Sequence, residues 1–378
     1  MIYFDNAATT CVSRHAAETA LTYMTELYAN PSSAHAFGFE AEKALRSART
    51  DMLGALGFIP SEGSLLFTGS GTEADNLALR GACHALMRRG KHLVISDSEH
   101  PAVENTAKDL EKEGFSVSRL STRGGKLDLD QARTVLTPDT VLVSCMAVNN
   151  ETGAIYDIAS LAKLTKALCP HALFHTDAVQ AFTKIPSALW KNADLVSVSS
   201  HKIHAPKGAG ALFVRKGVRL VPILAGGGQE NGLRSGTEAM PAVCAMAAAA
   251  KDAMTSFAGD YAKVSDLNTY LREKLQKIDG VVLNTGHIGF SAHILSIAVP
   301  GLRSEILLRF LSERGIYVSA GSACSAKHAD NRVLDAFGLP EKTADSTLRL
   351  SFSAYNTRME CDEFVNALCD GMRTLIHT

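Results

Sequence analysis

The strongest constraint on the fold comes from a regular alternation between short apolar segments and longer amphipathic segments between residues 65 and 215. Segments of strand length, several of them rich in Val and Ile, lie at 65–68, 92–96, 117–120, 141–148, 173–177, 195–199 and 211–214. Helical patterns lie between them at 73–89, 101–113, 128–136 and 158–168. Strands that alternate with helices favour crossover units and a mainly parallel, buried sheet. The sequence therefore predicts an α/β protein.

The chain changes character after these segments. Residues 236–278 are first rich in alanine and then amphipathic, which predicts a long helix that joins two domains. Further strands are expected at 293–299, 316–319 and 348–353, with helices at 304–314 and 359–376. This second pattern suits a smaller α+β domain. We therefore expect a large domain of residues 16–254 and a small domain of residues 1–15 and 255–378.

The overall composition argues against several classes of protein. Of the 378 residues, 46% are hydrophobic and 20% are charged, which is typical of a soluble globular protein and not of a disordered one. The formal net charge is −1 and no block of like charge occurs, so we expect no nucleic-acid or membrane partner. The apolar segment 239–250 is too short to cross a membrane, and the N-terminus lacks the pattern of an export signal. These features predict a cytoplasmic protein.

A small-residue turn provides the first candidate site. The residues TGSGTEA (68–74) directly follow a predicted strand and directly precede a predicted helix. Backbone N–H groups of such a turn converge on an anion at the helix N-terminus. The segment also fits a permissive dinucleotide-binding pattern, because the next strand ends at Asp97. The turn alone thus indicates a phosphate site, a dinucleotide site or an ordinary strand-to-helix connection.

Two charged residues follow buried strands of the predicted sheet. Asp177 ends one strand, where it is either a helix N-cap or the partner of a cationic ring nitrogen. Lys202 follows another, where it is either a surface lysine or an amine that forms an imine. A phosphate site, a strand-end aspartate and a strand-end lysine are together the three parts that pyridoxal phosphate needs. Their combination favours pyridoxal phosphate over a nicotinamide dinucleotide.

At this point the sequence resembles a known family, the class V aminotransferase-like enzymes of fold type I, and among them the cysteine desulfurases. The resemblance covers nearly the whole chain. It rests on the motifs YFDNAATT (3–10), NPSSAH (30–35), FTGSGTEADN (67–76), SEH (98–100), VNNETG (148–153), HTDAVQ (175–180), HK (201–202), RSGT (234–237), SAC (322–324) and TLRLS (347–351). It departs from the family at Ala205, where glycine is usual, and in a shorter segment after Cys324. The resemblance implies a large domain with a mainly parallel, seven-stranded sheet.

The resemblance also implies how the cofactor is held. Lys202 would bind pyridoxal phosphate covalently, Asp177 would pair with its ring nitrogen, Gln180 would bind its ring hydroxyl and His100 would stack on its ring. The residues expected to hold the phosphate are Gly71, Thr72, Ser199 and His201, with Thr237 contributed by the second subunit of a homodimer.

A further set of residues concerns the substrate. The resemblance implies that Arg349 clamps the carboxylate of L-cysteine with the help of Asn150, and that Cys324 is the nucleophile. Cys324 lies in a small and polar segment beside two residues that can be cationic, which favours a thiolate. None of the eight cysteines forms a C-x-x-C pair, and we expect no metal site.

These roles imply a cysteine desulfurase that converts L-cysteine to L-alanine. Lys202 would move the Cα proton, His100 would carry protons near neutral pH, and Cys324 would receive the sulfur as a persulfide. The persulfide would then pass to an acceptor protein, such as an iron–sulfur scaffold or a thiolation enzyme of tRNA or cofactor synthesis. The alternatives are a selenocysteine lyase, a related lyase or aminotransferase, and a non-catalytic scaffold for sulfur relay.

Overall fold

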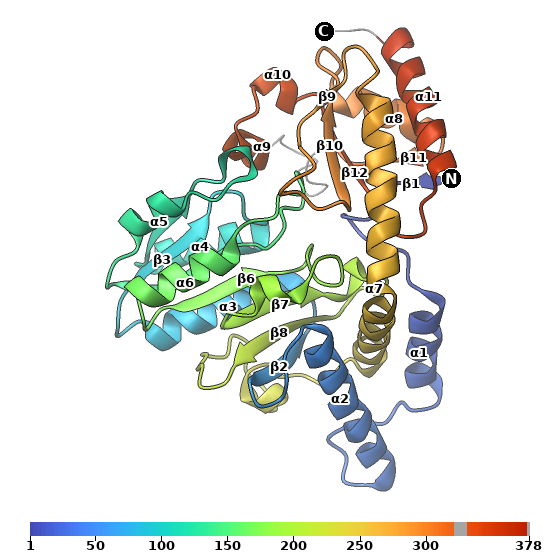
Figure 1. Cartoon of the computed structure of the whole chain (residues 1–378). Coiled ribbons are helices and arrows are strands. Elements are labelled where there is room, and N and C mark those ends of the chain that lie inside the picture. Colours follow the sequence, from blue (N-terminus) through green and yellow to red (C-terminus); the bar gives the residue numbers. More distant parts are fainter. Residues whose placement is uncertain (321–330, 376–378) are drawn as a thin grey trace.

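The large sheet of the computed structural model carries the site-forming strands (Figure 1). The structure describes residues 1–320 and 331–375. The seven strands, in spatial order, are β2 (Gly63–Thr68), β8 (Gly210–Arg215), β7 (Leu195–Ser199), β6 (Leu173–Asp177), β5 (Thr140–Ser144), β3 (His92–Ser96) and β4 (Ser116–Leu120). β8 runs in the opposite direction to the other six strands of this sheet. The expected α/β fold with a mainly parallel sheet of seven strands is confirmed.

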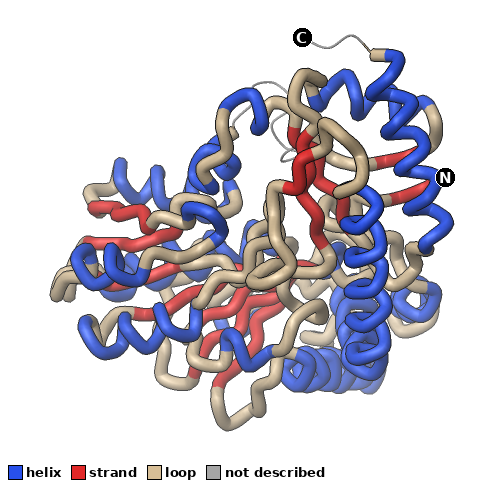
Figure 2. The backbone as a smooth tube through the Cα atoms, turned by 45° about the horizontal axis from the view of Figure 1, so that its top comes forward, coloured by secondary structure: helices blue, strands red, loops and turns tan. Residues whose placement is uncertain are grey.

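Helices cover both faces of this sheet (Figure 2). Because side chains alternate along a strand, Leu66 packs with α3 (Gly71–Leu86) and α4 (Pro101–Lys112), whereas Leu65 packs in the opposite layer. That opposite layer contains α2 (Ala36–Ala55), α6 (Ile158–Leu168) and the first half of α7 (Met240–Leu275). A parallel sheet that is buried in this way holds its strand ends rigidly, which suits the positioning of a site.

A second hydrophobic cluster forms around two smaller sheets. One pairs β1 (Ile2–Tyr3) with β11 (Ile316–Tyr317), and the other contains β9 (Val282–Leu283), β10 (Ile294–Ala298) and β12 (Thr347–Ser351). The helices α8 (Ser304–Glu313) and α11 (Arg358–Thr374) contribute to the same cluster. Along α7, Ala250 belongs to the first cluster and Val264 to the second. The division into domains at residue 254 stays a prediction, and the two clusters support it.

The structure differs from the sequence-based expectations in several elements. The expected strand 141–148 ends already at Ser144, because the chain then leaves the sheet and Ala147 N donates to Asp177 O at 2.9 Å. The helices not expected from the sequence are α1 (Arg14–Thr25), α2, α9 (Arg332–Phe337) and α10 (Glu341–Ala344), while the expected helix 128–136 forms as α5 (Leu129–Val135). Despite these differences, each of the seven strands expected between residues 65 and 215 is present in the large sheet.

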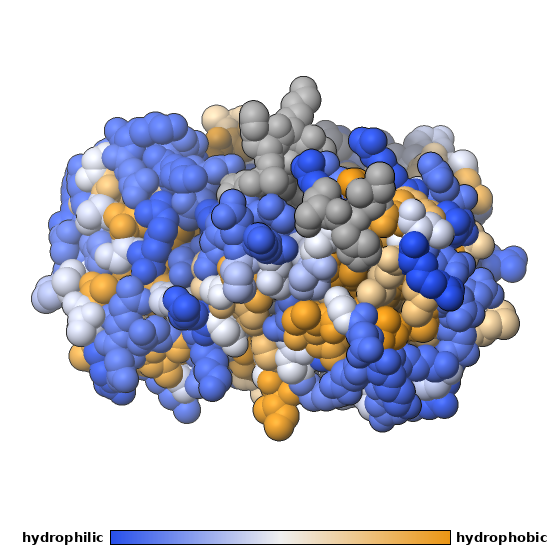
Figure 3. All heavy atoms as spheres, turned by 90° about the horizontal axis from the view of Figure 1, so that it is seen from above, coloured by the Kyte–Doolittle hydropathy of each residue, from blue (hydrophilic) through white to orange (hydrophobic). Residues whose placement is uncertain are grey.

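The surface agrees with the composition. Figure 3 shows a face that is mostly hydrophilic, with smaller apolar patches between the polar side chains. Among residues 1–320 and 331–375, no helix combines the length and the apolar character that crossing a membrane requires.

Candidate active site

The carboxyl ends of the parallel strands surround one cavity of about 280 Å³. This edge is where open α/β sheets bind ligands. The cavity brings together ten residues that were predicted from the sequence: Gly71, Thr72, His100, Asn150, Asp177, Gln180, Ser199, His201, Lys202 and Arg349. Thr237 lines a different cavity, together with Tyr23 and Tyr28. Cys324 lies outside the residues that the structure describes.

The N-terminus of α3 forms one end of the cavity. Ser70 caps this helix of 16 residues, and its Oγ accepts a hydrogen bond from Glu73 N at 3.1 Å. A Cβ at Gly71 would lie only 3.1 Å from Ser199 Cβ and 3.0 Å from Val179 Cγ2, so the close approach of these segments favours glycine. The backbone N–H groups of this first turn and the hydroxyl of Ser199 are suited to hold an anion.

A buried carboxylate lies at the end of β6. Asp177 is buried, and one of its oxygens accepts a hydrogen bond from Val179 N at 2.8 Å. Burial raises the pKa of Asp177 to about 6, against the lowering effects of the Val179 N–H and of Lys202. Burial and the nearby Asp177 also raise the pKa of Asp75, which lines the same cavity. A cationic donor, such as a protonated ring nitrogen, would stabilise the charged form of Asp177.

The amine of Lys202 lies in the cavity, directly after β7. Its Nζ donates to Ala7 O at 2.5 Å and to Ala8 O at 2.8 Å. The chain then turns through His204, whose φ is 63°, and enters a loop in which Ala205 is buried. The N-terminal segment therefore holds the lysine from one side, although it is far away in the sequence.

His100 caps α4 and lines the cavity. Its Nδ1 accepts a hydrogen bond from Ala102 N at 3.1 Å, which leaves the ring proton on Nε2. Burial, followed by the charges of Lys202 and Arg332, lowers the pKa of His100 to about 4. The imidazole is therefore neutral at pH 7 in this cavity, and the proton-carrying role expected of His100 stays a prediction.

A buried guanidinium closes the opposite side of the cavity. Arg349 Nη1 donates to Asn150 O at 2.9 Å, and Nη2 donates to Asp5 Oδ1 at 2.9 Å and to Ser319 Oγ at 3.0 Å. Within the part of the chain that the structure describes, Arg349 Nε and Asn150 Oδ1 are buried without a hydrogen-bond partner. Such groups are costly unless a ligand satisfies them, which fits the binding of a small carboxylate here.

Several residues of the site were not assigned a role from the sequence. Asp75 and Asp5 both lie inside motifs that carry the family resemblance, but neither spacing nor residue type shows that they meet Asp177 and Arg349. The carbonyl groups of Ala7 and Ala8 leave no signal in a sequence, because every residue has a carbonyl group.

Comparisons with known proteins agree with this geometry. The family model described as aminotransferase class-V matches residues 2–364, and the chain belongs to that family. A cysteine desulfurase of Trichormus azollae is 39% identical over 372 residues, which cover 97% of this chain and 92% of the relative. The structure of a NifS-like protein matches with a TM-score of 0.93 at 35% identity and covers 99% of this chain and 100% of that one.

A third match is a complex with cysteine. The structure of SspA in complex with cysteine has a TM-score of 0.80 and 33% identity, and covers 94% of this chain and 100% of that one.

Within the class V aminotransferases, this chain belongs to the cysteine desulfurases. The family depends on pyridoxal phosphate. The crowded Gly71 turn, the buried Asp177 and the amine of Lys202 in one cavity fit that cofactor.

Proposed function

We propose that this protein is a pyridoxal-phosphate-dependent cysteine desulfurase that converts L-cysteine to L-alanine and collects the sulfur as a persulfide on Cys324. The main observation behind the proposal is that one cavity is lined by residues from distant parts of the chain. These are the N-terminus of α3, Asp177, Lys202 and Arg349. A non-catalytic scaffold for sulfur relay has no need of this combination.

Different residues of the cavity suit different parts of the cofactor. Asp177 would hold the ring nitrogen, Gln180 the ring hydroxyl, His100 the ring face and Lys202 the aldehyde carbon. When bound, pyridoxal phosphate supplies an electron sink for the electrons of a broken bond at the substrate Cα. The residues proposed to hold the phosphate are Gly71, Thr72, Ser199 and His201.

The chain's own groups would perform the remaining tasks. Arg349 orients the substrate by its carboxylate. The released amine of Lys202 removes the Cα proton, and the carbonyl groups of Ala7 and Ala8 hold this amine near the substrate. The Cys324 thiolate then forms an S–S bond with the substrate sulfur as the C–S bond breaks. The three-carbon product takes up protons and leaves as alanine, while the persulfide remains on the enzyme.

We also propose that the protein acts as a homodimer in the cytoplasm and delivers sulfur to an acceptor protein. Thr237 is absent from the catalytic cavity and lies beside Tyr28, whose side chain is 68% exposed, and Met24, which is 59% exposed. Large apolar groups of this kind favour burial against a second copy. Such a contact would allow Thr237 to reach the partner's phosphate site.

The test of the function is alanine release from L-cysteine by the protein loaded with pyridoxal phosphate, in the presence of a thiol reductant. The proposal predicts alanine together with sulfide. Turnover of selenocysteine without turnover of cysteine would favour the selenocysteine lyase. A keto acid in place of alanine would favour an aminotransferase, and bound cofactor without any product would favour the scaffold.

Arg349→Lys tests the carboxylate clamp. Lysine keeps a positive charge beside Asp5 but loses the planar fork, so the KM for L-cysteine is expected to rise about 10-fold or more, with a smaller change in kcat. Steady-state alanine assays measure both constants. Arg303→Lys, at a side chain that is 64% exposed, is the matched control and should leave KM unchanged. An unchanged KM in Arg349→Lys would contradict the clamp.

A further inference from the structure

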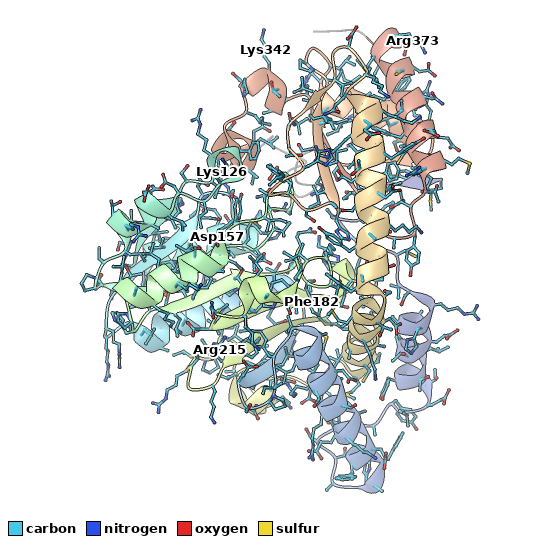
Figure 4. The ribbon with its side chains drawn as sticks, in the orientation of Figure 1. Lys126, Asp157, Phe182, Arg215, Lys342 and Arg373 are labelled. Carbon is cyan, nitrogen blue, oxygen red and sulfur yellow. The ribbon has the colours of Figure 1, made fainter. Side chains whose placement is uncertain are left out.

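Lys184 is a buried lysine beside the catalytic cavity that the mechanism above does not use. It follows Thr183, which has a φ of 63°, and its exposed fraction is only 9%. Other cationic side chains of this chain lie on the surface. Figure 4 shows Lys342 and Arg373 at the periphery of the molecule, on α10 and α11. Burial of an amine costs desolvation free energy, so we expect a functional reason for the position of Lys184.

The charged surroundings of Lys184 increase that cost. Burial and then the positive charges of Lys202 and Arg349 lower the pKa of Lys184 to about 7. His293 and His204 also lie close enough for the charge of Lys184 to act on them, and burial lowers the pKa of each imidazole as well. The amine thus lies among groups of like charge or no charge, and its hydrogen bond goes to Gln180 Oε1, at 3.1 Å.

This hydrogen bond sets the orientation of the Gln180 amide. A glutamine side chain has an accepting oxygen and a donating nitrogen, and a protonated lysine can pair only with the oxygen. Gln180 Nε2 accordingly donates to Ala7 O at 2.8 Å, and the same carbonyl accepts from Lys202 Nζ at 2.5 Å. A continuous chain of hydrogen bonds therefore joins Lys184, Gln180, Ala7 and Lys202.

Gln180 itself lines the cavity, and its Nε2 carries a second hydrogen beyond the one that Ala7 accepts. While Lys184 is protonated, its hydrogen bond to Oε1 draws electron density from the amide and makes that second N–H a stronger donor. Lys184 can thus act on the cavity without touching a ligand.

We propose that Lys184 is a positioning residue of this site, which holds the Gln180 amide with its nitrogen toward the cavity and strengthens its hydrogen bond to the cofactor's ring hydroxyl. The inference rests on the proposed function, since it needs pyridoxal phosphate in the cavity. It assigns to Lys184 a role in tuning the proton affinity of the Lys202 nitrogen once the cofactor is bound.

Lys184→Met tests this role, because it removes the donor and the charge while it keeps an unbranched side chain. We expect the pH midpoint of the visible absorbance change of the bound cofactor to rise by about half a unit or more, since a nearby positive charge opposes protonation. The midpoint is read by absorbance titration of the loaded enzyme. Lys342→Met, the same substitution at an exposed site, should leave the midpoint unchanged. An unmoved midpoint in folded Lys184→Met overturns the inference.

The route through Gln180 needs a second comparison. If Lys184 acts through this amide, Lys184→Met must shift the midpoint less in a Gln180→Leu background than in the wild type. Equal shifts in both backgrounds overturn the route. Should Lys184→Met fail to fold by circular dichroism, Lys184→Gln keeps a neutral donor, and a midpoint equal to that of the wild type would overturn the role of the charge.

The two proposals fail in different ways. A wild-type protein that binds no pyridoxal phosphate would overturn the proposed function and this inference with it. A wild type that binds the cofactor and releases alanine, together with an unmoved midpoint in Lys184→Met, would overturn the inference alone.

Discussion

Lys202→Ala is expected to lower alanine formation from L-cysteine about 10³-fold or more, because it removes both the covalent attachment of the cofactor and the base for the Cα proton. The amine lies in the catalytic cavity beside the carbonyl groups of Ala7 and Ala8, where no other lysine lines the described cavity. Borohydride reduction of the loaded protein, followed by mass spectrometry, should attach the cofactor at Lys202 in the wild type and nowhere in the variant.

A neighbouring lysine provides the control for this prediction. Lys207 is exposed and lies five residues further along the same loop, so Lys207→Ala should keep cofactor attachment and alanine formation. Normal turnover in Lys202→Ala would contradict the proposed mechanism.

Cys324→Ala is expected to abolish sulfur transfer while it leaves cofactor binding intact. The proposed C–S cleavage needs a thiolate that accepts the sulfur, so alanine formation should fall about 10³-fold. The visible spectrum of the bound cofactor should remain that of the wild type, because the residues that line the cavity are unchanged. Both quantities are measured on the same preparations.

Cys11→Ala is the matched control, since Cys11 is an exposed cysteine with no proposed role. It should keep the wild-type rate of alanine formation. Full turnover in Cys324→Ala would show that the nucleophile is misassigned and would favour a direct lyase.

Much of the fold could be predicted from the sequence because local periodicity marks most of the strands and helices. Segments such as 173–177 and 195–199 coincide with β6 and β7, since continuous apolar runs bounded by polar residues are typical of buried parallel strands. The end of β5 was wrong by four residues, because residues 145–148 are as apolar as the strand before them. Their departure from the sheet depends on contacts with Asp177 and Tyr156, which no local pattern contains.

Some residues of the site could likewise be predicted from local sequence patterns, whereas the roles of others depend on contacts in the folded chain. Asp177 and Lys202 could be found because parallel strands bring their carboxyl ends to one edge. Lys184 reads as an ordinary lysine in the sequence, and only the folded chain buries it beside Gln180 and the N-terminal segment. The lowered pKa of His100 likewise follows from burial and from the charge of Lys202, which are properties of the assembled cavity.

The most direct test of the central claim is a single turnover of the loaded wild-type protein with L-cysteine in the absence of reductant. We expect one alanine per active site, and a gain of one sulfur atom on the peptide that contains Cys324 and on no other cysteine-containing peptide. Alanine without any sulfur on Cys324, or sulfur on a different cysteine, would contradict it.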